Sequence, residues 1–356
     1  MSKKANPIYR GIDVGYGHVK WTNGESAKGL IEAHSFPSQA PISVDSDADV
    51  AFLKKRDTFS VPVGDRVYEI GRQVNLLVGS QQEMEQLDDT FAMSDAYTAR
   101  MFGALNYMLP GLGPERRIDV LVLGLPMTTL NKYRSAIEEK FTGPHRINLN
   151  GDIVTIGMCK VHPQPLGSYA LFLQSQPDAG KKPPMSLIID PGYNTVDWFV
   201  CEGLTGNLSQ SRAVNRGVSA YLRDIAKSII KTHSNFGVTE SEVVRILDRH
   251  FTRGDDFHIA GNEIPLEPHL AAGTPVIEQA AQAIRDTIGA GSEIRLILLT
   301  GGGASLYAQK IREKFPSHKV QVMEESPLAN VRGFHVIAHW IGASASRAEN
   351  KSRKGN

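Results

Sequence analysis

The sequence predicts an α/β fold with an internal duplication, and three observations lead to this prediction. A strand, a glycine turn and a second strand are expected over residues 8–21, and the same pattern returns over residues 186–198. A buried strand also leads into three consecutive glycines at 301–303 and then into a predicted helix. The chain has 356 residues, a length that favours two domains or one elaborated α/β domain.

Composition limits the class of protein. Apolar residues make up 41% and charged residues 22% of the chain, which argues against a mainly disordered or fibrous protein. The net charge of +1 creates no global attraction to nucleic acid or anionic membrane, so direct sequence-specific DNA binding is not expected. No apolar run reaches the roughly 18 residues that a spanning helix needs, and the N-terminus lacks the apolar core of a signal peptide. Two cysteines without a CxxC motif fit a reducing compartment, so we expect a cytoplasmic protein that does not contact membranes.

After the first hairpin, residues 31–90 are polar, contain three prolines and carry an acidic patch at 45–49, so a small insert is expected there. Residues 162–165 read His-Pro-Gln-Pro, and the two prolines predict a stiff loop. The other elements expected in this half are a helix from Ser94 to Pro110, a strand over 118–123, a helix over 132–141 and a strand over 153–161.

The second half is expected to follow a linker at 180–184, which is rich in lysine and proline. Thr239 and Glu242 form a predicted capping box, and Thr274-Pro275 predicts another helix start. The elements expected here are a strand over 186–190, helices over 215–233, 240–250 and 276–288, and a strand over 295–300.

The duplicated motif places an aspartate at a strand end beside a glycine turn, as Asp13 with Gly15 and as Asp190 with Gly192. Such a carboxylate can hold hydrated Mg²⁺, and turn N–H groups without bulky side chains can approach phosphate oxygens. A single Asp-x-Gly also begins many ordinary hairpins, so the pairing of two copies is the stronger signal. The glycines at 301–303 would let the backbone pass close to a ribose and an α-phosphate, although a flexible strand–helix turn is the alternative.

These three motifs resemble the two phosphate loops and the adenosine loop of the actin-like ATPase superfamily. Residues 122–126 resemble its first connecting motif and residues 326–334 its second, and all five motifs occur in the family order. Within the superfamily, the segments 149–152, 160–164 and 186–190 are most similar to ParM/StbA-type plasmid segregation proteins.

The resemblance implies an actin-like, ribonuclease H-like fold in which duplicated domains surround a nucleotide cleft. Domain I would comprise 1–176 plus 331–346, with the insert at 31–90, and domain II would comprise 186–330, with an insert at about 235–275. A basic tail at 347–356 would follow, and it is expected to be mobile.

The resemblance also implies residue roles. Asp13 and Asp190 match the aspartates that act in catalysis and hold Mg²⁺ through water, and Lys20 matches the lysine that reaches the β- and γ-phosphates. Gln164 falls where the family orients the attacking water; because glutamine is a poor base, its role would be positioning, and a solvent-facing loop residue is the alternative.

Two tyrosines depart from the family pattern. Tyr16 stands where Ser or Thr is usual, and Tyr193 stands where a second glycine is usual, which puts affinity and base preference in question. The implied nucleotide-binding residues are Gly15, Tyr16, Gly17, Lys20, Gly192, Tyr193, Asn194, Thr195, Gly301, Gly302, Gly303 and Asn330.

The function that the resemblance implies is an ATP or GTP hydrolase that uses Mg²⁺ and assembles with itself into filaments for plasmid or DNA segregation. A DNA-binding adaptor at a plasmid centromere would be its partner. A small-molecule kinase of the same superfamily is the alternative, since fold alone does not decide function.

One further pair of side chains has a ligand-like spacing. His335 and His339 stand four residues apart on a predicted helix, which could hold zinc. Residue 336 is Val where a metalloprotease motif has Glu, so a metal role is not expected.

Overall fold

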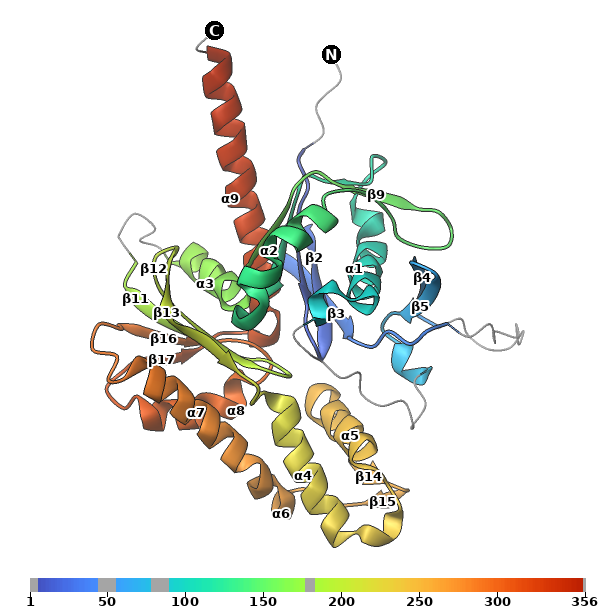
Figure 1. Cartoon of the computed structure of the whole chain (residues 1–356), viewed down its shortest axis with the longest axis vertical. Helices are drawn as coiled ribbons and strands as arrows, with labels where there is room; N and C mark the ends of the chain where they lie inside the picture. The colour runs from blue at the N-terminus through green and yellow to red at the C-terminus, as the bar shows by residue number, and fades with distance from the viewer. Residues whose placement is uncertain (1–5, 44–55, 78–89, 177–182, 355–356) are drawn as a thin grey trace. The chain divides into compact units, whose positions relative to one another are not determined.

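The computed structural model describes residues 6–43, 56–77, 90–176 and 183–354 (Figure 1). The chain divides into two compact units, which are described separately. Unit 1 holds the described residues up to Pro183 together with those from Glu324 onward, and unit 2 holds Pro184–Met323. The expected acidic patch at 45–49 and most of the expected linker lie outside the described residues.

Unit 1 is built on a five-stranded mixed sheet with the order β10-β7-β1-β2-β3. β1 (Tyr9–Val14), β2 (His18–Glu25) and β3 (Ile31–Pro37) are antiparallel neighbours, whereas β7 (Val120–Leu125) pairs parallel with β1, and β10 (Cys159–Pro163) pairs parallel with β7. All residues of β7 are buried, as expected for a parallel strand that is covered on both faces. β3 corrects the prediction that an insert begins at residue 31, because its polar side chains lie on an edge strand of the main sheet.

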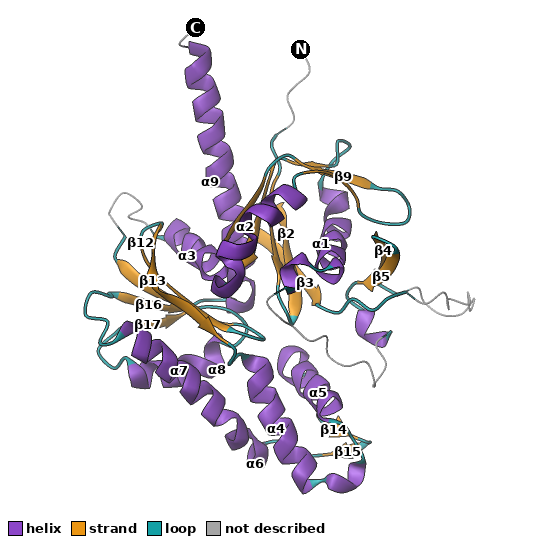
Figure 2. Cartoon of the chain, viewed as in Figure 1, coloured by secondary structure: helices purple, strands orange, loops and turns teal. Residues whose placement is uncertain are grey.

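Helices cover both faces of this sheet (Figure 2). Ile12 and Val14 of β1 share a hydrophobic cluster with residues of α1 (Asp95–Met108) and α2 (Met127–Lys140). The neighbouring Gly11 faces the opposite way, where it meets α9 (Ser326–Lys354), and α9 packs on α3 (Gln164–Ser175). The alternation along β1 therefore separates an α1/α2 face from an α3/α9 face.

The smaller elements of unit 1 are a hairpin and a three-stranded sheet, with three short 3₁₀ helices. They are β4 (Phe59–Val63) with β5 (Arg66–Ile70); β6 (Arg117–Ile118), β9 (Ile153–Ile156) and β8 (Gly143–Arg146); and η1 (Val74–Leu76), η2 (Phe91–Met93) and η3 (Leu109–Gly111).

Unit 2 repeats the strand order and directions of unit 1. Its sheet has the order β13-β12-β11-β16-β17, with antiparallel pairing among the first three strands and parallel pairing among the last three. The strands are β11 (Met185–Pro191), β12 (Val196–Glu202), β13 (Thr205–Val214), β16 (Leu296–Leu299) and β17 (Val320–Val322). The duplication expected from the two hairpins thus extends to whole sheets.

The remaining elements of unit 2 are mostly helical. They are α4 (Val218–Thr232), η4 (Ser234–Phe236), α5 (Glu240–Arg253), β14 (His258–Ile259), β15 (Asn262–Glu263), α6 (Glu267–Leu270), η5 (Ala271–Gly273), α7 (Thr274–Ile288) and α8 (Ala304–Lys314). The predicted capping box is confirmed, since the Glu242 N–H donates to Thr239 Oγ1 and the Thr239 N–H donates to Glu242 Oε2.

Three predicted features are corrected. Gln164 is the first residue of α3 and not part of a loop, because a proline in the first turn lacks only an N–H that the helix does not use. The segment from 347 onward, expected to be a mobile tail, continues α9 as far as Lys354. The unit boundary also precedes α9 and does not fall within it, so Asn330 belongs to unit 1.

Among residues 6–43, 56–77, 90–176 and 183–354, no helix combines the length and apolar character needed to cross a bilayer.

Candidate functional site

Asp13 is the centre of the predicted site residues in unit 1. Its side chain is only 2% exposed, and Lys20 Nζ lies 3.1 Å from Asp13 Oδ2. Gln164 Nε2 donates to Asp13 Oδ1 over 2.9 Å. Two donors from different elements thus engage both oxygens of one buried carboxylate, which fixes its orientation.

The sheet register explains this grouping. Asp13 and Lys20 are direct partners across β1 and β2, so their side chains lie on the same face. Asp13 also shares the parity of Gly11, which places it on the α3/α9 face. β1, β7 and β10 are parallel, so their carboxyl ends lie at one sheet edge, and Gln164 follows β10 directly.

Gly124 of β7, within the first connecting motif at 122–126, is also part of this arrangement. A Cβ at Gly124 would lie 2.9 Å from Gln164 Cγ and closer still to the Phe334 ring. Glycine at this position therefore leaves room for the Gln164 side chain next to Asp13.

The first glycine turn, residues 15–17, is held by backbone hydrogen bonds. The Gly15 N–H donates to the His18 carbonyl over 3.2 Å, and the Gly17 carbonyl accepts from the Ser38 N–H over 2.9 Å. The Tyr16 ring packs against Phe91 with ring centroids 4.9 Å apart. Tyr16 thus has a packing role in unit 1, and a nucleotide contact by this residue stays a prediction.

In unit 2, Asp190 lies beside the glycine run. Asp190 is 6% exposed, and Gly301 has φ +78°. A Cβ at Gly301 would collide with Asp190 Oδ1, so only glycine fits here. The Gly303 N–H donates to the Pro191 carbonyl over 2.9 Å, which joins the two loops. A Cβ at Gly302 would meet no atom within 4 Å, so open space lies beside this backbone.

The second glycine turn, residues 192–195, packs on the start of α4. The Val218 and Ser219 N–H groups donate to the Gly192 and Tyr193 carbonyls over 3.0 and 2.7 Å. The first amides of α4 are therefore used by the turn itself.

One side chain and one backbone carbonyl of this turn are also held by hydrogen bonds. Thr195 Oγ1 donates to Asp197 Oδ2 over 2.6 Å, and the Asn194 carbonyl accepts from the Gly217 N–H over 3.1 Å. Burial and the nearby Asp248 carboxylate raise the pKa of Tyr193 above its ordinary value. The Tyr193 hydroxyl therefore stays protonated at neutral pH.

Asn330 is a buried residue of α9. It is 4% exposed on α9, in unit 1, and its Oδ1 accepts a short hydrogen bond from Ser168 Oγ of α3. The structure thus brings together Asp13, Lys20 and Gln164 in unit 1, and Asp190, the 192–195 turn and 301–303 in unit 2. We call these two groups half-site 1 and half-site 2.

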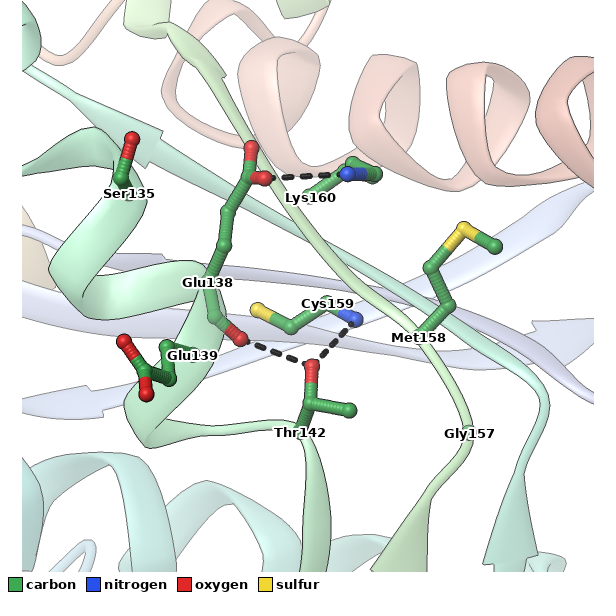
Figure 3. A pocket seen from close by; sticks show the side chains of 8 residues that line it. All are labelled: Ser135, Glu138, Glu139, Thr142, Gly157, Met158, Cys159 and Lys160. Carbon is green, nitrogen blue, oxygen red and sulfur yellow. Dashed lines mark hydrogen bonds and ion pairs between the residues drawn. The ribbon is translucent and has the colours of Figure 1, made fainter.

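A pocket of about 550 Å³ lies elsewhere in unit 1 (Figure 3). Glu138 of α2 accepts from Lys160 Nζ over 3.0 Å and from the Val161 N–H over 3.0 Å. Although burial favours the protonated acid, these bonds and one from Arg134 hold the pKa of Glu138 below its ordinary value. The pocket is lined by Ser135, Glu138, Glu139, Thr142, Gly157, Met158, Cys159 and Lys160, a set separate from both half-sites.

Comparison with known proteins agrees with this architecture. Residues 11–167 match the family model of the actin like proteins N terminal domain. A search of curated proteins found none that matches the sequence.

Solved structures match over nearly the whole chain. A 15-stranded ParM filament from Clostridium botulinum aligns with a TM-score of 0.71 and 16% identity, covering 94% of this chain and 99% of that chain. The archaeal actin homolog Ta0583 in complex with ADP aligns with a TM-score of 0.69 and 18% identity, covering 93% and 99%. Apo psk41 ParM aligns with a TM-score of 0.62 and 17% identity, covering 96% and 100%. The chain therefore has the actin-like fold, and its residues 11–167 match the model of the N-terminal domain of actin-like proteins.

Proposed function

We propose that this protein is a nucleotide-dependent, filament-forming ATPase that acts in plasmid or DNA segregation. The observation that supports this proposal most directly is the buried Asp13 carboxylate with Lys20 and Gln164 as its donors. A fixed carboxylate, a cation and an amide are the groups that nucleotide hydrolysis uses to hold a metal's water shell, a phosphate and an attacking water. The cytoplasm is the compartment that we propose for it.

The donor sets of both half-sites fit Mg²⁺-nucleotide. Asp13 and Asp190 supply the hard oxygen ligands that Mg²⁺ accepts through its bound waters. The backbone at Gly301 and Gly302 offers an approach without side-chain bulk, next to the start of α8. When bound, Mg²⁺ would neutralise charge that develops on the phosphate oxygens.

In hydrolysis, the residues of this chain would divide the work. Lys20 would turn its ammonium group from Asp13 Oδ2 toward the phosphate oxygens. Gln164 would orient the attacking water through its amide, which its hydrogen bond to Asp13 holds in place. Because these three residues act on the phosphates, both ATP and GTP would be suitable substrates. Tyr16 and Tyr193 would then affect how the rest of the nucleotide fits.

Self-assembly is proposed from the fold shared with the Clostridium botulinum ParM filament. A head-to-tail contact between copies does not close on itself and so produces filaments. An adaptor that binds a plasmid centromere would connect such filaments to DNA, which agrees with the near-neutral charge of this chain.

Nucleotide binding is tested by thermal unfolding with and without Mg²⁺-ATP or Mg²⁺-GTP. Binding to the folded state should raise the melting temperature by mass action. We expect Asp13→Ala and Asp190→Ala each to reduce this shift, while Asp224→Ala, a change at a partly exposed residue of an α4 ion pair, should preserve it. Shifts of wild-type size in both site variants would show that neither aspartate takes part in nucleotide binding.

Filament formation is tested by pelleting and light scattering across protein concentration, with no acceptor molecule added. We expect ATPase activity per molecule to rise steeply above a critical concentration, together with scattering. Protein that stays in the supernatant under every nucleotide and salt condition and phosphorylates a sugar or other alcohol would instead support the small-molecule kinase alternative.

A further inference from the structure

Two histidines of α9 and a glutamate of β2 form a cluster that half-site 1 does not use. His335 Nε2 lies 4.0 Å from Glu25 Oε1, and His339 Nε2 lies 3.8 Å from the same oxygen. One ligand atom from each of the three side chains fits within 4.8 Å of the others. We propose that Glu25, His335 and His339 bind Zn²⁺ or a chemically similar late divalent transition metal, which joins α9 to β2.

His335 provides the strongest argument, because it is nearly fully buried and one of its nitrogens is unsatisfied. The residue is 2% exposed, and within the described part of the chain its Nε2 has no hydrogen-bond partner. Buried nitrogens without a partner are uncommon in native proteins, and a bound ion is one of the explanations for them. Here the unsatisfied atom lies on the side of the ring that approaches Glu25.

Thr22 accounts for the other nitrogen of the His335 ring. His335 Nδ1 lies 3.2 Å from Thr22 Oγ1. The same oxygen accepts from the Gly11 N–H over 2.9 Å, and its own proton can go to the Gly11 carbonyl at 3.5 Å. Thr22 is then an acceptor for an Nδ1–H, which leaves the lone pair on Nε2. A histidine ligand oriented by a hydrogen bond at its other nitrogen is typical of metal sites.

The spacing suits a metal after a small closure. Residues four apart lie on one helix face, and the two rings have centroids 4.8 Å apart. Ligand atoms about 2.1 Å from tetrahedral zinc are roughly 3.4 Å from one another. Glu25 and His339 are each 45% exposed, so their side chains can move inward without repacking the core.

The charges around the cluster favour neutral imidazoles. Burial, His339 and the nearby Arg10 lower the pKa of His335 to about 3. Burial and Arg10 also lower the pKa of His339, against the influence of Glu25. Arg10 donates to the Tyr9 and Gly111 carbonyls, and its positive charge opposes a bound cation. Glu25 supplies the opposing negative charge, and two imidazoles with a carboxylate are ligands that zinc accepts.

The sequence alone argues against this site, because residue 336 is Val where a metalloprotease motif has Glu. Glu25 is distant in sequence and reaches them only because β2 packs against α9. It lies at the opposite end of β2 from the turn beside Asp13, so the cluster is separate from half-site 1.

The test is metal binding by the untagged full-length protein, measured with Zn²⁺ by calorimetry and with Co²⁺ by visible absorption. We expect one Zn²⁺ per chain, a rise in melting temperature, and the strong absorption bands of tetrahedral Co²⁺. Glu25→Gln and His339→Gln should each weaken binding roughly 10-fold or more, since each removes one ligand. Thr22→Val should also weaken it about 10-fold by releasing the His335 ring.

His258→Gln is the matched control, since His258 is an exposed histidine of β14 in unit 2. We expect this variant to bind as the wild type does. Circular dichroism without metal checks that each variant is folded; Glu25→Gln changes an exposed side chain and keeps the test valid if a buried variant fails to fold. Zn²⁺ affinity that is equal in wild type, Glu25→Gln and His339→Gln, or absent in the wild type, would overturn the proposal.

Discussion

At the scale of single residues, Asp13 shows how a buried carboxylate can be kept in place before any ligand arrives. A charge this deeply buried is costly unless it is paired, and Lys20 and Gln164 supply one donor to each oxygen. The same contacts give each residue a defined position next to where a phosphate would bind. Removing one of the three should therefore change activity in a distinct way.

Gln164→Ala should leave nucleotide binding largely intact and slow hydrolysis on the order of 10²-fold, about 3 kcal/mol of transition-state positioning. The reason is that the Gln164 amide donates to Asp13, so the substitution removes an orienting amide. Phosphate release under single-turnover conditions measures the effect. Gln309→Ala, an exposed change on α8, is the control and should behave as wild type. An unchanged rate in Gln164→Ala would mean that this glutamine does not position water.

His162 gives a prediction about pH. Burial, with Arg134 and Lys160 nearby, lowers the pKa of His162 to about 4, against the influence of Glu138, and its Nε2 has no partner among the described residues. Below an unfolded pKa of about 6.5 the unfolded chain binds a proton that the folded chain rejects. The contribution of His162 to the free energy of unfolding is therefore fully present above about pH 6.5. It is lost as the pH falls toward 4, by up to about 1.4 kcal/mol per pH unit.

Urea unfolding at several pH values between 7 and 4.5 measures this effect. His162→Gln removes the titrating group, so its unfolding midpoint should depend less on pH than that of the wild type. His258→Gln, an exposed histidine change, should keep the wild-type dependence. Identical pH profiles for wild type and His162→Gln would show that other groups cause the acid sensitivity.

At the scale of elements, the crossing of α3 and α9 depends on two glycines in contact. A Cβ at Gly333 would overlap the Gly167 carbonyl, and a Cβ at Gly167 would meet the Asn330 carbonyl and the Phe334 ring. The short Ser168–Asn330 hydrogen bond lies at the same crossing. The helices can approach this closely only because neither has a side chain at the point of contact.

Gly333→Ala should lower the melting temperature, although alanine favours helix formation by about 1 kcal/mol over glycine. The added methyl group meets backbone, which cannot rotate away, and overpacking of this kind costs about 1–3 kcal/mol or more. Ser344→Ala on the exposed part of α9 is the control and should change the melting temperature little. A Gly333→Ala protein as stable as the control would mean that the helices separate without cost.

The same elements show what the sequence could predict. The hairpins β1–β2 and β11–β12 were predictable because apolar alternation and an Asp-x-Gly-Tyr turn occur in both. β3 was not, because an edge strand such as 31–37 carries polar side chains that look like a loop. Gln164 was placed in a loop because two prolines flank it, yet the structure shows them ending β10 and beginning α3. Glu25 could not be connected with His335 and His339, since only packing joins residues so distant in sequence.

At the scale of the whole molecule, the two units share one strand order, and each carries one half-site at the end of its first strand and the following turn. A duplicated sheet explains why an aspartate and a glycine turn occur twice. Under the proposed function, activity would then need both units and a neighbouring copy. Assembly and hydrolysis should therefore be coupled.

A slowly hydrolysed ATP analogue should sustain light scattering without decay, because phosphate loss is what would loosen the filament. With ATP, scattering should rise and then fall as nucleotide is consumed. Asp13→Ala should give little scattering with either nucleotide, which controls for aggregation. Equal decay with ATP and with the analogue would show that disassembly does not depend on hydrolysis.

The order of the units along the chain has a consequence for synthesis on the ribosome. The described residues of unit 2 form one stretch from Pro184 to Met323, whereas unit 1 is completed by α9, which follows that stretch. Until α9 emerges, the α3/α9 face of the unit 1 sheet lacks buried partners such as Val331 and Phe334. A nascent chain would thus expose the part of the unit 1 sheet that α9 later covers while unit 2 folds, so the unit synthesised first would be completed last.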